Sequence, residues 1–204
     1  MIFVSSIFDL LVVRDAALLE SILKYIAANT GSIVSTKKIS DYLTSSGRKT
    51  TSDTIDNYLK MLESAFIIYK ANRYDLKGKI FLKTYEKYYM VDIGIRNRLT
   101  GLQNKDYGHV LENIVFLELL RRGYEVSIGK VGSLEVDFVA TKPDEMIYYQ
   151  VSATIMDEKT RERELRPLEA ISDNYPKYIL TMDQNIYNDY SGIKIKNIID
   201  FLLE

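Results

Sequence analysis

Three short segments of the chain carry acidic and polar side chains that one helix and two strands could bring together. Glu112 lies in a helical pattern, and Glu135 and Asp137 lie in the second strand pattern after it. The next strand pattern carries Gln150 and Ser152. Alternate side chains of a strand point to the same face, and carboxylate oxygens are the ligands that Mg²⁺ and Mn²⁺ prefer. The spacing therefore predicts the skeleton of a metal-dependent nuclease site, with Glu135 and Asp137 as metal ligands.

The elements that must position these residues follow one another as helix, three strands, helix and strand. The sequence pattern predicts helices over 108–122 and 157–171, and strands over 123–128, 133–141, 146–154 and 176–182. A last strand near Ile193–Ile198 and a short helix from Ile199 to Leu203 complete the pattern.

Two expectations about burial follow from these elements. The helix over 108–122 is apolar nearly all round, which is typical of a buried helix. Glu112, Asn113 and Glu118 are therefore expected among apolar neighbours. In the strand over 133–141, alternation puts one set of side chains on the face opposite Asp137. That set is Val136, Phe138 and Ala140.

Several longer stretches resemble a known family. They are KYYMVDIGIRN at 87–97, GHVLENIVFLELLRRGYEV at 108–126, EVDFVA at 135–140, QVS at 150–152 and TRERELRPLEAISDNYPKYILTMD at 160–183. In them the chain is similar to the C-terminal half of bacterial and archaeal AAA-type ATPases, whose chains end in a winged helix followed by a PD-(D/E)xK nuclease-like domain. The resemblance implies an α+β or α/β fold. Its first part would be an N-terminal winged helix-turn-helix, and its second a nuclease-like αβββαβ domain.

The resemblance also assigns roles to the acidic and polar residues. It makes Glu112 the acid of the helix, Asp137 the acid of the strand, and Gln150-Val151-Ser152 the counterpart of the E-x-K element. Two of the three defining groups are therefore altered. A neutral amide oxygen is a poorer ligand for Mg²⁺ than a carboxylate, and a serine hydroxyl cannot supply the charge of a lysine ammonium. The site is accordingly expected to be inactive or weakly active.

Two interpretations of the altered site stay open. In the first, a cation from the next predicted helix replaces the lysine and leaves a Mg²⁺-dependent nuclease that acts on DNA; Lys159, Arg161 and Arg163 could supply it. In the second, the acids form a hydrogen-bonded polar cluster in a folded scaffold. The charges of the helix then form a solvated face with i,i+4 pairs such as Glu162 with Arg166. His109, one turn before Glu112, is expected to be structural.

Composition excludes several classes of protein. The 204 residues are 47% hydrophobic and 27% charged, which is typical of a globular chain of one large or two small domains. The chain has no Cys and one His, so disulfide frameworks and Cys- or multi-His zinc sites are excluded. The lack of Cys fits a cytoplasmic protein. No apolar run approaches the ~20 residues of a membrane helix.

The first residues and the missing phosphate-binding loop bear on how the chain relates to a longer protein. The segment MIFVSSIFDLLVV lacks the basic start and cleavage site of a signal peptide. It is interpreted as a helix interrupted from something upstream, so that Met1 is not the natural start. The chain contains no G-x-x-x-x-G-K-[ST] sequence. In the family that the chain resembles, an ATPase domain lies upstream.

The first half has the pattern of a winged helix. Apolar spacing predicts a helix over 16–28, Ser35 caps a second helix over 36–46, and Thr50, Thr51 and Ser52 cap a third over 53–64. Strand patterns over 66–74 and 79–92 follow, joined by Asp75-Leu76-Lys77-Gly78, and predict the hairpin of the wing. The polar segment 101–106 is taken as the domain boundary. This gives domains of residues 1–100 and 101–204.

Charge is divided unevenly between the two halves. Residues 1–92 carry 13 Lys and Arg against 10 Asp and Glu, and residues 93–204 carry 14 against 18. Binding of DNA is therefore assigned to the first half. The candidate residues are Arg48, Lys49, Arg73, Lys77, Lys79 and Lys83. The third helix carries three acids against Lys60, so the alternative is a winged helix that docks on its own ATPase domain or on another protein.

The sequence thus leads to two functional hypotheses. The first is a DNA- or partner-binding C-terminal portion of an AAA-type ATPase with an inactive or weakly active nuclease-like domain, for which Mg or Mn is the candidate cofactor. The alternative is a divalent-metal-dependent nuclease with Glu112, Glu135 and Asp137 as its acids.

Overall fold

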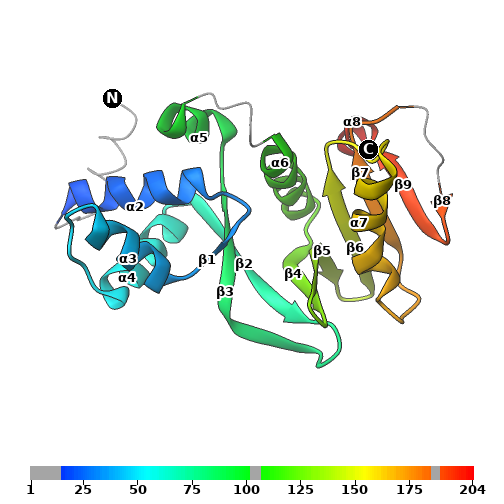
Figure 1. The fold of residues 1–204 in the computed structure, drawn as a ribbon, viewed down its shortest axis with the longest axis horizontal. Coiled ribbons are helices and arrows are strands. Elements are labelled where there is room, and N and C mark those ends of the chain that lie inside the picture. Colours follow the sequence, from blue (N-terminus) through cyan, green and yellow to red (C-terminus); the bar gives the residue numbers. More distant parts are fainter. Residues whose placement is uncertain (1–14, 102–106, 185–188) are drawn as a thin grey trace. The chain divides into compact units, whose positions relative to one another are not determined.

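Seven helices and nine strands occur in the part of the chain that the structure describes, so the protein is a mixed α/β protein (Figure 1). The structure is a computed structural model that describes residues 15–101, 107–184 and 189–204, without the side chains of Lys83 and Thr84. The N-terminal segment MIFVSSIFDLLVV and most of the predicted boundary at 101–106 lie outside these residues. The chain divides into two units. Unit 1 is 1–70 with 86–103, and unit 2 is 71–85 with 104–204.

Unit 1 contains four helices, each begun by a capping side chain. They are α2 (Ala16–Ala28), α3 (Thr36–Ser45), α4 (Ser52–Ser64) and α5 (Ile93–Thr100). The side chains of Asp15, Ser35, Thr51 and Asp92 each accept a hydrogen bond from a backbone N–H in the first turn of the helix that follows. The first three helices confirm the sequence prediction, whereas α5 was not predicted.

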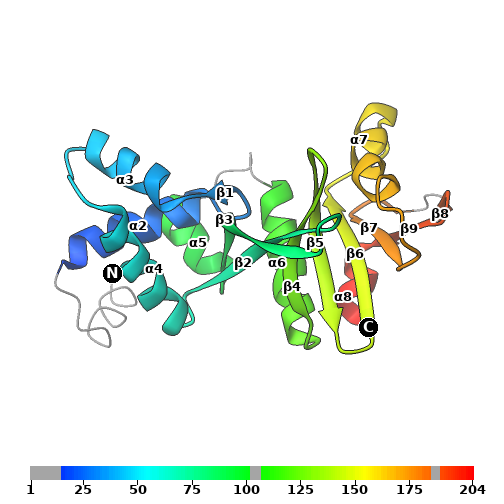
Figure 2. The same ribbon diagram turned by 90° about the horizontal axis from the view of Figure 1, so that it is seen from below.

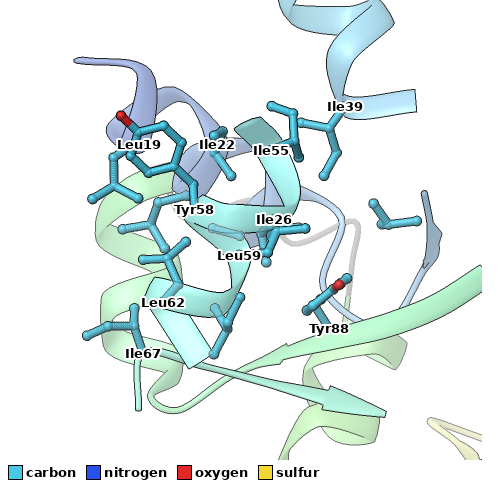
Figure 3. Close-up of a cluster of buried hydrophobic side chains, with 14 of the residues drawn as sticks. Leu19, Ile22, Ile26, Ile39, Ile55, Tyr58, Leu59, Leu62, Ile67 and Tyr88 are labelled. Carbon is cyan, nitrogen blue, oxygen red and sulfur yellow. The ribbon is translucent and has the colours of Figure 1, made fainter. Parts of the chain in front are cut away.

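The core of unit 1 lies between the first three helices. Leu19, Ile22 and Ile26 of α2 are fully buried against Ile55 and Leu59 of α4 and their neighbours (Figure 3). The short strand β1 (Ile33–Val34) pairs antiparallel with the inner end of β3 (Ile80–Met90). This packing of apolar helix faces is the main source of stability for such short helices.

Unit 2 is built on a mixed sheet. Its strands lie in the order β2 (Ile68–Asp75), β4 (Glu125–Val131), β5 (Leu134–Lys142), β6 (Glu145–Ser152), β7 (Lys177–Thr181), β9 (Ile193–Asn197) and β8 (Asp189–Tyr190). Strands β4, β5 and β6 are antiparallel, whereas β6, β7 and β9 run parallel. The strands predicted over 123–128, 133–141, 146–154, 176–182 and 193–198 are confirmed. Strand β8 was not predicted.

Helices cover both faces of this sheet (Figures 1 and 2). On one face, Phe116 of α6 (Tyr107–Arg121) lies against Phe138, and Phe201 of α8 (Ile198–Leu203) lies against Tyr149. On the other face lies α7 (Glu158–Glu169). The buried cluster on the α7 face consists of Val131, Val136, Val139, Tyr148, Ile155, Leu165, Leu168, Ile171, Ile179, Ile193 and Ile195.

A β-bulge in β5 overturns one expectation from the sequence. The pairing of β4 with β5 changes register between Ser127↔Val139 and Gly129↔Val136, so β5 carries one extra residue there. Val136 therefore lies in the same cluster as Val139, on the α7 face, and not on the face of Phe138. Strict alternation was the wrong assumption because a bulge shifts the phase of side chains. Gly129 is needed opposite the bulge, since a Cβ there would lie 2.9 Å from Cβ of Val136.

The predicted wing also differs from a free hairpin. Residues Arg73, Tyr74 and Asp75 at the outer end of β2 pair in parallel with Ile128, Gly129 and Lys130 of β4. The segment 71–85, which the sequence division put in residues 1–100, therefore belongs to unit 2. The predicted domains are continuous in sequence, whereas the units of the structure are not.

Candidate functional site

The predicted acids and Gln150 line one cavity in unit 2. Its volume is about 740 Å³, and it lies between α6, β5, β6 and α7. Glu112, Glu135, Asp137 and Gln150 all line it, but Ser152 does not. Four predicted residues from one helix and two strands therefore line the same cavity.

Asp137 and Gln150 form a reciprocal clamp where β5 and β6 separate. The regular ladder between the two strands ends at Phe138↔Tyr149. Beyond it, the backbone N–H of Val151 donates to Oδ2 of Asp137 at 2.8 Å, and the backbone N–H of Asp137 donates to Oε1 of Gln150 at 3.2 Å. Each side chain thus satisfies a backbone donor of the opposite strand that has lost its ladder partner.

Gln150 also connects the clamp to helix α7. Its Nε2 donates to Oε2 of Glu164 at 2.9 Å, and both residues are buried, with exposed fractions of 7% and 6%. The other oxygen of Glu164 accepts from Nε and Nη2 of Arg163, at 3.1 and 2.6 Å. The amide and the carboxylate are complementary, because Gln150 offers a donor on one side and an acceptor on the other.

Ser152 has no part in the cavity. Its hydroxyl donates to the backbone carbonyl of Thr154 at 2.9 Å. The residue is buried, with an exposed fraction of 7%. A hydroxyl committed to its own loop in this way supplies neither a cation nor a proton to the residues around Asp137.

Glu112 is buried on α6, as the sequence predicted for it and for Asn113 and Glu118. Its Oε2 lies 3.5 Å from Nδ1 of His109, a nitrogen that makes no hydrogen bond with any described residue. Glu118 does not line the cavity and is held by Arg121 and Arg122, which lower the pKa of this carboxyl. Glu112 is therefore the one acid of α6 that lines the cavity among the described residues.

Two of the three cations expected beside the acids line the cavity. Lys159 and Arg163 do so. Arg161 does not, because its guanidinium donates to the carbonyl of Ile155 at 3.5 Å and lies 5.4 Å from the ring centre of Tyr190. The expectation for Arg161 was therefore wrong, since residues 161 and 163 lie on different sides of a helix with 3.6 residues per turn.

The sequence analysis missed Glu164, which it counted among the charges of a solvated helix. The helical spacing of the apolar residues could have indicated that Glu164 is buried. Glu164 stands one position before Leu165 and four before Leu168, and both leucines are buried on the inner face of α7. A residue at that position lies at the margin of the buried face.

The residues around Asp137 do not fit a metal ion. Among the residues that the structure describes, no group of three or more His, Cys, Asp or Glu side chains is arranged to hold one. One oxygen of Asp137 is taken by the N–H of Val151, and the amide oxygen of Gln150 is taken by the N–H of Asp137. The polar groups satisfy one another, as a structural cluster requires.

The six residues expected to bind DNA fall into both units. Arg48 and Lys49 belong to unit 1, where Nη1 of Arg48 lies 3.8 Å from Oδ1 of Asp15. Arg73, Lys77 and Lys79 belong to unit 2. The side chain of Lys83 lies outside the described part of the structure.

Comparison with known proteins gives relatives in two organisms. The chain is 43% identical over 209 residues to an uncharacterized protein of Haemophilus influenzae, in a match that covers 98% of this chain and 52% of that protein. It is 32% identical over 169 residues to the uncharacterized protein MJ1544 of Methanocaldococcus jannaschii, in a match that covers 79% of this chain and 36% of that protein. The chain thus spans about half the length, or less, of these relatives. No solved structure matches it.

The remaining findings concern membranes and family. No helix in the described ranges is both long and apolar enough to cross a membrane. Residues 4–106, half of the chain, match the model of the family described as "Domain of unknown function (DUF8612)". The chain belongs to this family.

Proposed function

We propose that this chain is the nucleic-acid- or partner-recognition portion of a longer AAA-type ATPase, and that its second unit is a nuclease-like domain that binds without cutting. Unit 1 would be the winged helix, and unit 2 the PD-(D/E)xK-like domain. ATP hydrolysis would belong to a domain upstream. The relatives are about two to three times as long as the matched region, which supports a role as part of a larger protein.

The element order supports the proposed architecture. Helices α2, α3 and α4 followed by a hairpin have the order of a winged helix. The order α6, β4, β5, β6, α7 and β7 is the αβββαβ order of the nuclease-like core, and the acids at 112, 135 and 137 line its cavity. Fold alone does not give activity.

The proposal that unit 2 does not cut rests on one observation, the hydrogen-bond network of Asp137, Gln150 and Glu164. Hydrolysis of a phosphodiester needs oxygen ligands that are free for a divalent ion and a cation for the developing charge. One oxygen of Asp137 and the amide oxygen of Gln150 accept from backbone N–H groups, and the two oxygens of Glu164 accept from Gln150 and Arg163. The cavity would then keep its shape and its polar walls, and could bind a ligand without cutting it.

Nucleic acid is favoured as the target because three of the lysines predicted to bind DNA are exposed. Lys49, Lys77 and Lys79 are exposed, and none of them forms an ion pair with a residue that the structure describes. Unpaired lysines on a surface attract phosphate and release counterions on binding.

A paired binding and cleavage experiment tests the proposal. Labelled single-stranded and duplex oligonucleotides are incubated with the 204-residue chain in Mg²⁺ or Mn²⁺, with Asp137→Ala as the reference for background cleavage. We expect salt-dependent binding and cleavage no faster than that of Asp137→Ala. Divalent-dependent cleavage that Asp137→Ala abolishes would establish the nuclease instead, and failure to bind any oligonucleotide at low salt would reject nucleic acid as the target.

A further inference from the structure

The outer end of the β2–β3 hairpin is a rigid, exposed part of unit 2. The backbone N–H groups of Lys77 and Gly78 donate to Oδ1 of Asp75, at 3.0 and 3.1 Å, and these bonds lower the pKa of the Asp75 carboxyl. The N–H of Leu76 donates to the carbonyl of Lys130 in β4 at 2.9 Å. The turn is therefore fixed both by its own side chain and by the neighbouring strand.

This end of the hairpin carries a net positive charge. Lys77 and Lys79 are exposed. The ammonium of Lys77 reaches the turn between β4 and β5, since a Cβ on Gly132 would lie 4.0 Å from it. Lys130 adds a third cation. The acids nearby are Asp75, which is held by its turn, and Glu135, which is the cross-strand partner of Lys130.

Planar side chains are exposed beside these lysines. Phe81 is 62% exposed, and the centre of its ring lies 5.1 Å from that of Tyr74. Tyr85 is 49% exposed, and the guanidinium of Arg73 lies 6.0 Å from the centre of its ring. Large aromatic side chains with about half of their surface or more in water are costly to leave uncovered.

The backbone holds the aromatic segment in place at two strained positions. Lys79 and Tyr85 adopt φ values of +52° and +69°, in the left-handed region that side chains other than Gly rarely occupy. They flank the exposed residues Ile80 and Phe81 on either side. Such strain is kept where the surrounding structure fixes a functional conformation.

We infer that this hairpin end binds single-stranded nucleic acid. This rests on the proposed function and names the form of the target and its place. Bases would stack on Phe81 and Tyr85, and phosphates would contact Lys77 and Lys79. Stacking on exposed aromatic rings requires bases that are not already stacked in a duplex, and cations beside such rings are the usual arrangement for single strands. An anionic membrane is less well matched, because two of the exposed large side chains at this end, Phe81 and Tyr85, are planar rings, with Ile80 as an aliphatic neighbour.

Fluorescence anisotropy with a labelled oligo(dT) strand and with a duplex of equal length tests the inference. Phe81→Ala should weaken binding of the single strand roughly tenfold, because a base stacked on an aromatic ring contributes about 1–3 kcal/mol. Lys77→Glu with Lys79→Glu should weaken it further and flatten the dependence on salt. Leu203→Ala and Lys194→Glu are matched controls, since Leu203 is 81% exposed and Lys194 lies on β9, away from β2 in the strand order.

Each outcome bears on a separate statement. Weaker single-strand binding in Phe81→Ala and in the lysine variant, with both controls unchanged, supports the inference. Binding that both hairpin variants retain, or a preference for the duplex, would overturn this site while leaving the proposed function intact. Binding of phosphatidylglycerol vesicles in place of oligonucleotides would make the hairpin a membrane contact and overturn the inference. An unmodified chain that binds no nucleic acid would overturn the inference and also reject nucleic acid as the target in the proposed function.

Discussion

The sharpest test of the site is the change Gln150→Glu, which puts an acid where the proposed nuclease-like assignment has the acid of an E-x-K element. In the structure the amide nitrogen of Gln150 lies 2.9 Å from Oε2 of Glu164, and both side chains are buried. A carboxylate at position 150 would replace this donor by a second acceptor. Two like charges would then face each other on side chains that are only 7% and 6% exposed.

The loss in free energy of unfolding caused by Gln150→Glu can be estimated in two ways. Two unit charges about 4 Å apart repel by about 4 kcal/mol at an effective dielectric constant of 20. Protonating one carboxyl at pH 7 instead costs about 3.7 kcal/mol, since its unperturbed pKa is about 4.3. Arg163 already neutralises part of the charge of Glu164. We therefore expect Gln150→Glu to lower the free energy of unfolding of unit 2 by about 2–3 kcal/mol at pH 7, or roughly 4–12 °C in melting temperature for a chain of this size.

The compensating change distinguishes this mechanism from a general loss of packing. Glu164→Gln alone should cost little, because the amide oxygen that it introduces can still accept from Gln150 and the pair with exposed Arg163 is weak. The double variant Gln150→Glu, Glu164→Gln exchanges donor and acceptor, and should recover about 2 kcal/mol relative to Gln150→Glu. Glu162→Gln, an exposed change in the lining of the same cavity, is the control.

The pH dependence of the stability of Gln150→Glu gives a second test of the same mechanism. In Gln150→Glu the crowded pair binds a proton more tightly when folded than when unfolded, so its pKa is raised. Stability must then rise relative to wild type as pH falls from 7 toward 5. Thermal unfolding followed by circular dichroism at both pH values measures this. A Gln150→Glu variant as stable as wild type at pH 7, or one that Glu164→Gln does not rescue, would refute the proposed coupling.

Two further predictions concern stability elsewhere. Glu118→Gln should cost about 1–2 kcal/mol at pH 7, because the carboxylate accepts three bonds of 2.7 Å from Arg121 and Arg122. Because the pKa of Glu118 is lowered, its contribution to stability is present above about pH 4.5 and is lost as pH falls further. Urea titrations should therefore show that the difference in stability between wild type and Glu118→Gln is present at pH 7 and disappears at pH 3. A difference that persists at pH 3 would argue against an electrostatic origin. Phe66→Gly should stabilise unit 1 by about 0.5–1 kcal/mol, since Phe66 follows the end of α4 with φ +53° and is 67% exposed. A loss in chemical denaturation would instead show that the ring contributes packing.

Most helices and strands of the fold could be predicted from the sequence because the patterns that indicate them are local. Ser35 and Thr51 cap α3 and α4 through side-chain bonds within one turn, and apolar periodicity marks the buried face of α2. The strands of unit 2 are short and rich in β-branched and aromatic residues. Helix α5 escaped prediction because its apolar periodicity is weak, although Asp92 caps it.

The features that escaped prediction depend on partners far away in the chain. The bulge in β5 arises from its register with β4, and only Gly129, a glycine within a strand, gave a hint of it. Pairing of the outer hairpin with β4 joins segments far apart in the sequence, such as Arg73 with Ile128, and no local pattern specifies it. The position of Arg161 beside Tyr190, away from the cavity, likewise follows from the exact phase of α7.

Glu164 gives a structural reason for glutamine at position 150, the first residue of the Gln150-Val151-Ser152 triplet. If Gln150 were only a glutamate lost by drift, nothing would require a buried carboxylate on α7 to face it. A carboxylate 2.9 Å from the amide is compatible with glutamine and not with an ionised glutamate at position 150. The acid at 164 therefore favours a neutral donor, such as the amide of Gln150, at position 150. Because the same amide also secures the N–H of Asp137, this network stabilises the divergence of β5 and β6 that opens the cavity. In the proposed function, this network would keep the shape of a nuclease-like site while it engages one oxygen of Asp137 and both oxygens of Glu164.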